Sequence, residues 1–338
     1  MEQETVMKPP SSQNHQNKFD FLHKLDIPQD FQVDQTQQDI LDSCPISKIT
    51  QILAQHGYSL ISELGRGGFS RVFLVNSLKY DQQFAVKVIN VYAAPILKDS
   101  TFVREIKYLL HLNHPLIIKL YENFQDGDFM FIVLEYCENG SLREVINKCG
   151  QITCHDFWKM AKQISEAIHF CHTKNVAHRD IKPENLFVDQ YDRIRLADFG
   201  FATSNFQGEK VQDHCGSRVY TPPEIINLTK QYDPFKADIW SLAITFFVMH
   251  TGKYPFPLST HKEMVEAIKM SSLDFPLDCD PKVRHLIIQM THVKPDKRIS
   301  IEKVIQIIDE TISQYPNGID VSRRKSDDKK NLPRLRGN

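Results

Sequence analysis

The sequence predicts an α+β protein with two unequal lobes, a small β-rich lobe followed by a larger helical lobe. Apolar and polar residues alternate early in the chain, as in "YSLISELGRGGFSRVFLVNS" (58–77), whereas helical periodicity dominates from about residue 140 onward. The composition, 41% hydrophobic and 25% charged, is that of an ordinary globular protein. A chain of 338 residues is long enough for both lobes and a large core.

The small lobe is expected over residues 58–137. Segment 58–77 breaks at glycines and resumes as a strand, which predicts a hairpin. A third strand is expected at 83–91, one main helix at 101–112 and a further strand at 129–137.

The larger lobe is expected over residues 138–311. Its predicted helices are 141–147, 155–173, 222–227, 236–251, 260–270, 281–291 and 300–311. The longest apolar stretch, "IWSLAITFFVM" (239–249), is too short to span a membrane and predicts a buried helix. We therefore expect no membrane association.

The two ends of the chain differ in composition from the lobes. Residues 1–57 form an extension that is expected to be mostly disordered, because its first 45 residues are rich in Gln, Asn, Asp and Ser. A short helix is expected near its end, with Ser47 as N-cap and an apolar face of Ile49, Ile52 and Leu53. Residues 312–338 form a basic polar tail whose few apolar residues are badly spaced for a calmodulin-binding helix, so we expect no calmodulin site.

Charge and cysteine usage restrict the partners and the compartment. Lys plus Arg, at 41, nearly balance Asp plus Glu, at 42, so no nucleic-acid partner is expected. The seven Cys include no CxxC pair, which indicates reduced thiols, and the N-terminus lacks an apolar signal region. These features predict an intracellular protein, cytoplasmic or nuclear, and leave its oligomeric state open.

The glycine-rich turn of the first hairpin is suited to phosphate binding. "GRGGFSRV" (65–72) matches GxGxxGxV at Gly65, Gly67 and Val72, with Ser70 at the third glycine. Glycine lets backbone N–H groups approach phosphate oxygens. A turn of this kind is on its own weak evidence, and its place between two strands fits neither a Rossmann nor a Walker loop.

Lys87 and Glu105 follow this turn, one in the strand "FAVKV" and the other in the next helix. Each alone is explained equally well by a solvent-facing position. An ion pair between them would hold the Lys87 ammonium toward phosphates lying under the glycine-rich hairpin.

The run "HRDIKPENLF" (178–187) gathers Asp180, Lys182 and Asn185 on a loop whose proline prevents a regular helix. Asp198 of "DFG" adds a second carboxylate after the apolar strand "RIRLA". Asn185 and Asp198 offer the hard oxygen ligands that Mg²⁺ takes alongside phosphates. Asp180 can then accept a hydroxyl proton while Lys182 neutralises phosphoryl charge, so the loop predicts phosphoryl transfer.

Seven motifs follow in order along the chain: GRGGFSRV, AVK, the helix Glu, HRDIKPEN, DFG, PPE (222–224) and DIW (238–240). Their order and spacing resemble a eukaryotic protein kinase with its bilobal fold. The Lys-Pro-Glu after Asp180 is similar to serine/threonine kinases, and "CGSRVYTPPE" (215–224) resembles the calmodulin-dependent and AMP-activated kinase group. The resemblance implies transfer of the γ-phosphate of ATP to Ser/Thr hydroxyls of protein substrates, with Mg²⁺ as cofactor and Mn²⁺ as an alternative.

The resemblance also implies roles for individual residues. Lys87 would contact the α- and β-phosphates, Asp180 would be the catalytic base, and Asp238 would brace the catalytic loop. Leu134 would be the gatekeeper of an adenine site at the hinge. The residues expected to bind ATP are Leu64, Gly65, Gly67, Gly68, Ser70, Val72, Ala85, Lys87, Leu134, Glu135, Cys137, Phe187 and Asp198.

Further roles concern the activation segment and the coupling of the lobes. Glu224 would pair with Arg298, and Ser217 would bond Asp180 and Lys182. The side chains expected to stack between the lobes are Leu109, Leu120, His178 and Phe199.

Asp213 departs from the family pattern. Kinases that align without gaps from Asp198 to Glu224 carry an activating threonine at this position, and its phosphate docks onto the arginine of HRD, here Arg179. We expect the Asp213 carboxylate to replace part of this phosphate's docking permanently by pairing with Arg179. The kinase would then be active without activation-loop phosphorylation. The alternative is an exposed aspartate with no role.

A catalytically inactive kinase-fold scaffold, a pseudokinase, is the rival interpretation. It predicts the loss of the lysine, the catalytic aspartate or the metal-binding aspartate, and this sequence keeps all three.

The sequence says less about which substrates are preferred. In basophilic relatives, acidic residues bind arginines that precede the acceptor residue. Glu184 lies at one such position, but Ser141 and Val248 occupy others. We therefore expect at most a moderate preference for arginine.

Overall fold

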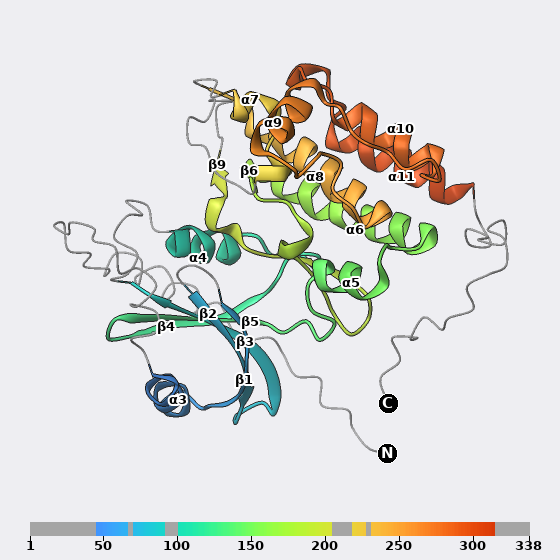
Figure 1. Ribbon diagram of the computed structural model, residues 1–338. Coiled ribbons are helices and arrows are strands. Elements are labelled where there is room, and N and C mark those ends of the chain that lie inside the picture. The colour runs from blue at the N-terminus through green and yellow to red at the C-terminus, as the bar shows by residue number, and fades with distance from the viewer. Residues whose placement is uncertain (1–44, 67–69, 92–100, 205–217, 228–230, 315–338) are drawn as a thin grey trace, which may run out of the picture.

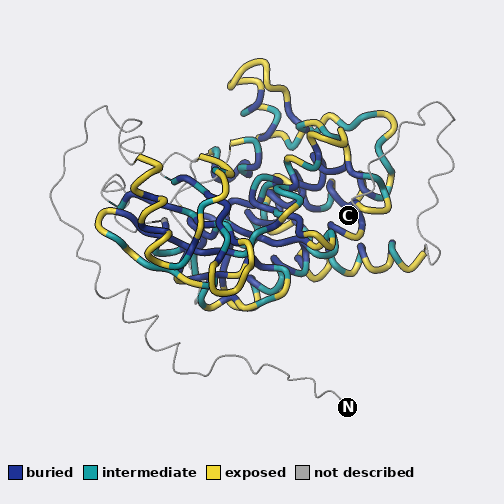
Figure 2. The backbone as a smooth tube through the Cα atoms, turned by 90° about the horizontal axis from the view of Figure 1, so that it is seen from below, coloured by how far each residue is buried: buried dark blue, intermediate teal, exposed yellow. Residues whose placement is uncertain are grey.

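A computed structural model describes residues 45–66, 70–91, 101–204, 218–227 and 231–314. The predictions for Gly67, Gly68, Asp213 and Ser217 fall outside these residues. Figure 1 shows a small lobe built on a β-sheet and a larger lobe built of helices. The buried stretches run through the interior of both lobes, as Figure 2 shows.

The small lobe is an antiparallel sheet with strand order β1-β2-β3-β5-β4. Its strands are Tyr58–Arg66 (β1), Ser70–Ser77 (β2), Gln82–Asn90 (β3), Leu120–Asp126 (β4) and Phe129–Glu135 (β5). The sequence pattern missed β4, because "LYENFQD" does not alternate and only Leu120 in it is buried. Pairing with β5, and not local pattern, makes this segment a strand.

Strand β5 is buried on both faces and divides the small lobe into two apolar layers. Phe129, Phe131 and Val133 face one cluster, and the alternate residues Met130 and Ile132 face the other. Helix α3 (Ile46–Gln55) covers the first face and α4 (Thr101–His111) the second (Figure 1). The face toward α4 is the one that carries the functional side chains.

Helix α3 buries Ile49, Ile52 and Leu53, as its apolar pattern predicts. The expected N-cap was wrong: Pro45, and not Ser47, precedes the helix. The reason is that the Pro45 carbonyl already accepts hydrogen bonds from the backbone N–H groups of Lys48 and Ile49, at 2.9 and 3.4 Å, which places Ser47 inside the first turn.

Replacing Leu53 by Ala should lower the free energy of unfolding by about 2–5 kcal/mol, because the fully buried side chain leaves a cavity between α3 and the sheet. Urea unfolding would measure this. Gln51→Ala, on the exposed side of the same helix, is the matched control. Equal unfolding midpoints for the two variants would show that α3 does not stabilise the small lobe.

The larger lobe is mainly helical. Its α-helices are Leu142–Cys149 (α5), Cys154–Thr173 (α6), Pro223–Ile226 (α7), Pro234–Thr251 (α8), His261–Met270 (α9), Pro281–Met290 (α10) and Ile301–Ser313 (α11). Helix α8 is buried from Ala237 to His250, which explains why its sequence is apolar on all sides. None of the helices in the described ranges is both long and apolar enough to cross a membrane.

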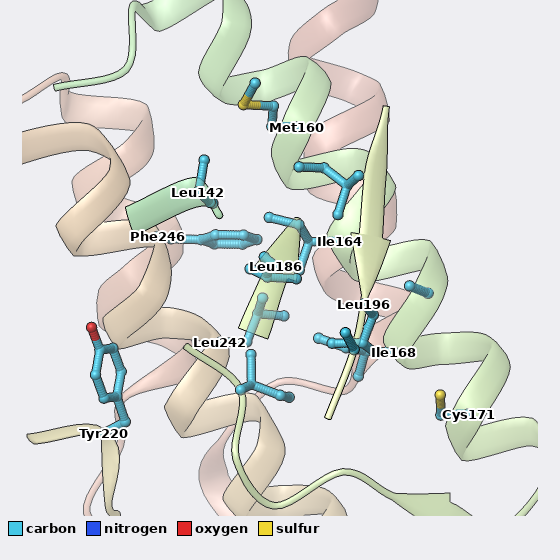
Figure 3. Packing of buried hydrophobic residues seen from close by; sticks show 14 of the residues in the cluster. Leu142, Met160, Ile164, Ile168, Cys171, Leu186, Leu196, Tyr220, Leu242 and Phe246 are labelled. Carbon is cyan, nitrogen blue, oxygen red and sulfur yellow. The ribbon is translucent and has the colours of Figure 1, made fainter. Parts of the chain in front are cut away.

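Two short antiparallel strand pairs lie between α6 and α7 in the sequence. Strand β6 (Val176–Ala177) pairs with β9 (Thr203–Ser204), and β7 (Leu186–Val188) pairs with β8 (Ile194–Leu196). Leu186 of β7 lies between Phe246 of α8 and Ile164 of α6 (Figure 3), and all three side chains are fully buried. This packing anchors the loops before β7 and after β8 to the rigid core of the larger lobe.

Candidate active site

Lys87, Glu105 and Asp198 meet between the two lobes. Lys87 Nζ lies 2.6 Å from Glu105 Oε2 and 3.7 Å from Asp198 Oδ1. The alternation of β3 explains this arrangement, because Val86 and Val88 bury their side chains on the α3 side and turn Lys87 toward α4. The structure thus brings together a strand, a helix and the DFG turn.

The electrostatics of this cluster keep both Lys87 and Asp198 charged. Burial alone would lower the pKa of Lys87, but the carboxylates of Glu105 and Asp198 outweigh it and raise that pKa. Burial alone would raise the pKa of Asp198, yet Lys87, His178 and Lys182 hold it below its ordinary value. A cation and a carboxylate are therefore both available near neutral pH.

Asp180 lies at the centre of a hydrogen-bonded loop. Its Oδ2 accepts hydrogen bonds from Lys182 Nζ at 2.6 Å and from Asn185 Nδ2 at 2.9 Å. Asn185 Nδ2 also reaches the Asp180 carbonyl at 2.8 Å. These bonds hold the predicted base, cation and amide in one geometry.

Asp238 of α8 braces the start of this loop. Its fully buried carboxylate accepts the backbone N–H groups of His178 and Arg179, both at 2.8 Å. Arg179 adopts a positive φ of 65°, an unfavourable conformation that these bonds stabilise. His172 lies 2.9 Å from the same carboxylate. No role was predicted for His172 from the sequence, where the only signal is a histidine near the end of α6.

The donor set beside Asp180 fits Mg²⁺. The β7–β8 pairing brings Asn185 and Asp198 to the same end of a hairpin, where the Ala197 N–H donates to the Asn185 carbonyl at 2.9 Å. Because Asn185 donates its Nδ2 hydrogens to Asp180, its Oδ1 is left as an acceptor. Asp198 holds a left-handed backbone conformation, with φ of 63°. An amide oxygen and a carboxylate are the hard ligands that Mg²⁺ takes with phosphates and water.

The residues predicted to contact adenine include Ala85 on β3, Leu134 on β5 and Phe187 on β7. Ala85 and Phe187 are half-buried and pack against the same cluster as Leu134. At the hinge, the Cys137 carbonyl accepts from Gly140 N–H at 3.1 Å, whereas the Cys137 N–H has no partner among the described residues. This unpaired donor, on a buried residue, suits a ring nitrogen of adenine.

Other residues predicted to bind ATP lie mainly on β1 and β2. Val72 is half-buried opposite Lys87, and Ser70 is half-buried at the start of β2. Leu64 and Gly65 are exposed at the end of β1. The Glu135 N–H donates to the Lys119 carbonyl at 2.9 Å, so a ligand cannot use this donor.

Glu224 and Arg298 form a buried, two-pronged ion pair. The Nη1–Oε1 and Nη2–Oε2 distances are 2.8 and 2.6 Å. Arg298 also donates to the carbonyls of Lys236 and His292. The structure thus ties α7 to α8 and to the turn before α11, as the resemblance implied.

The side chains expected to stack between the lobes are all buried. The rings of His178 and Phe199 lie edge to face with centroids 4.8 Å apart, and His178 Nε2 is 3.0 Å from the Ala197 carbonyl. Leu109 and Leu120 belong to the same cluster. Arg179 donates from Nε to the Phe201 carbonyl at 2.7 Å, so it is tied to the segment that follows DFG.

Glu63 of β1 joins Arg66 and Arg71 in a charge cluster at the end of β1, next to the glycine-rich turn in the sequence. This cluster was not predicted from the sequence. Hydrogen bonds from Arg71 at 2.7 Å and from Arg66 at 2.6 Å lower the pKa of Glu63 from 4.5 to about 2. A carboxylate whose folded pKa is depressed stabilises the fold above its unfolded pKa and loses this contribution as the pH falls.

Glu63→Gln should therefore destabilise the protein near neutral pH, and the difference from wild type should shrink as the pH falls from 4.5 toward 2. Unfolding midpoints of both proteins across this range would measure the effect. Glu266→Gln, at an exposed helix position, should show no such trend. A difference in unfolding midpoint between Glu63→Gln and wild type that stays constant with pH would contradict the lowered pKa of Glu63.

The fold and this constellation define a protein kinase domain. The family described as protein kinase domain matches residues 58–307, and the chain belongs to this family. The resemblance and the bilobal α+β fold expected from the sequence are thereby confirmed.

Two curated relatives are serine/threonine kinases by name. The chain is 32% identical over 249 residues to probable serine/threonine-protein kinase MARK-A of Dictyostelium discoideum. It is 34% identical over 247 residues to CBL-interacting serine/threonine-protein kinase 10 of Arabidopsis thaliana. These matches span 73% and 71% of this chain but 23% and 51% of the relatives, so the chain spans at most about half the length of either.

Proposed function

We propose that this chain is an ATP-dependent serine/threonine protein kinase that uses Mg²⁺, with Mn²⁺ as an alternative, to phosphorylate Ser/Thr hydroxyls of proteins. The observation that carries the proposal is the joining of Lys87 to Glu105 at 2.6 Å and to Asp198 at 3.7 Å, beside the Asp180 loop. The names of the two relatives support serine and threonine as acceptors.

In this proposal each predicted site residue has one role in binding ATP or in transferring its γ-phosphate. Lys87 binds phosphate oxygens, and the Cys137 N–H meets adenine. Asp180 orients the acceptor hydroxyl and takes its proton, while Lys182 stabilises charge on the transferred phosphoryl group. Mg²⁺, held by Asn185 and Asp198, would neutralise phosphate charge.

A pseudokinase scaffold is the alternative from another functional class. It requires a defect in the lysine, the catalytic aspartate or the metal-binding aspartate. The presence of Lys87, Asp180 and Asp198, and their contacts, support the enzyme instead.

We extend the proposal to activity without activation-loop phosphorylation. Asp213 lies outside the described residues, so the support is its place in the sequence, where relatives of this type carry the activating threonine. Asp213→Ala in phosphatase-treated protein should lower kcat if the carboxylate pairs with Arg179. Unchanged activity in this variant would sink the extension without touching the kinase assignment.

Phosphatase-treated protein, Mg-ATP and an arrayed peptide library with Ser, Thr or Tyr acceptors would test the main proposal. We expect transfer to Ser and Thr peptides and none by Asp198→Asn. Transfer confined to Tyr peptides would refute the acceptor class, and equal signals from wild type and Asp198→Asn would indicate a contaminating kinase.

A further inference from the structure

Four segments distant in sequence converge beside the catalytic loop. Arg143 of α5 donates from Nε to Glu184 Oε1 at 2.8 Å. Its Nη2 donates to the hydroxyls of Tyr220 and Tyr254, at 2.7 and 3.0 Å. The guanidinium carbon also lies 5.1 Å from the centroid of the Tyr254 ring. One arginine thus bridges a carboxylate and two phenols.

The surrounding structure holds Arg143 in this position. Ser141 and Glu144 form a reciprocal capping box that fixes the first turn of α5, which carries Arg143. Tyr220 is buried, and the rings of Tyr220 and Tyr254 lie edge to face. The Arg143 side chain is only 17% exposed, so much of its ordering is provided by the fold before any substrate binds.

Glu184 is close in sequence to the predicted catalytic base. It is in the short turn Pro183–Asn185, and Asn185 is bonded to the predicted base Asp180. The Glu184 side chain is 39% exposed, although its Oε2 atom is buried. A peptide that presents its hydroxyl to Asp180 brings the residues flanking the acceptor close to this carboxylate.

The two oxygens of Glu184 are in different situations. Oε1 is bonded to Arg143, whereas Oε2 is buried and has no hydrogen-bond partner among the described residues. A substrate guanidinium binds a carboxylate best through two parallel hydrogen bonds. While Arg143 holds Oε1, Glu184 cannot offer both oxygens, and the charge it would present is already neutralised.

We propose that Arg143 is a specificity-determining residue that occupies Glu184 and suppresses selection of arginine near the acceptor. The substrates are then Ser/Thr proteins without a required basic residue beside the phosphorylated hydroxyl. The sequence led us to expect at most a moderate preference for arginine, and with Glu184 occupied by Arg143 we expect no preference. The inference rests on the proposed kinase activity and deepens it.

The test compares peptide pairs that differ only by Arg or Gln at one position, from four residues before the acceptor to four after it. The readout is the Arg/Gln ratio of kcat/KM, because a ratio within one preparation is independent of the folded fraction. The proteins are wild type, Arg143→Leu, the double variant Arg143→Leu/Glu184→Gln and Lys148→Leu, which removes an exposed cation from the same helix.

For wild type and Lys148→Leu we expect ratios within about threefold of one at all positions. Arg143→Leu should raise the ratio about tenfold or more at one position, as a freed carboxylate binds the substrate guanidinium, and the double variant should abolish this gain. A wild-type ratio already above about tenfold that Glu184→Gln removes would overturn the inference. An unchanged ratio in Arg143→Leu would do the same. Absence of transfer to every peptide by wild type would instead refute the kinase activity.

Discussion

Replacing Asp180 by Asn should lower kcat for peptide phosphorylation about 10²–10⁴-fold while changing ATP affinity little, because the group that accepts the hydroxyl proton is lost, together with the charge that pairs with Lys182. The substitution keeps the shape of the side chain and its place beside Lys182 and Asn185. ATP contacts are expected from Lys87 and the hinge, which Asp180 does not touch. Steady-state kinetics with ATP and peptide varied separately would measure both parameters.

Asp128→Asn, at an exposed turn between β4 and β5, is the matched control and should keep wild-type kinetics. The assignment of Asp180 as the base would be wrong if its variant, folded and binding ATP normally, lost less than about tenfold in kcat.

Replacing Arg298 by Leu should lower the free energy of unfolding of the larger lobe by about 3–5 kcal/mol, because it leaves the Glu224 carboxylate buried without its partner. The carbonyls of Lys236 and His292 lose their donors as well. Both tryptophans, Trp158 and Trp240, lie in the larger lobe, so tryptophan fluorescence during urea unfolding reports on this lobe.

Lys297→Leu, which removes an exposed cation next to Arg298, should change stability by no more than about 0.5 kcal/mol. The double variant Arg298→Leu/Glu224→Gln should recover part of the loss, because the unpaired charge is gone. A loss in Arg298→Leu no larger than that in Lys297→Leu would contradict the buried pair.

The sequence predicted elements well where local pattern and packing agree. The alternation in 83–91 and 129–137 corresponds to β3 and β5, and the apolar stretch 239–249 lies in the buried helix α8. β4 was missed because its strand conformation depends on a neighbour and not on its own residues. The cap of α3 was misassigned because serine is usually a better cap than proline, and only the backbone bonds to Pro45 reveal the true start.

In the candidate site, too, residues that belong to local motifs could be predicted, whereas residues that act through distant partners could not. Asp180, Asn185 and Asp198 were predicted as site residues from short motifs, since phosphoryl transfer requires particular residue types at close spacing. Long-range partners leave no such trace: His172 is 66 residues from Asp238, and Arg143 is 41 residues from Glu184. Nothing local in "GSLREV" distinguishes Arg143 from a solvated surface arginine, so the neutralisation of Glu184 emerges only from the folded geometry.

The measurement that tests the central claim most directly is transfer of labelled γ-phosphate from Mg-ATP to a mixed Ser/Thr peptide pool, with ATP binding measured in the same samples. Phosphatase-treated wild type should bind ATP and label the pool, and Asp198→Asn should not label it. ATP binding together with labelling no greater than that of Asp198→Asn, even after Mg²⁺ and Mn²⁺ have both been supplied, would contradict the claim that these residues form an assembled, self-sufficient transfer site.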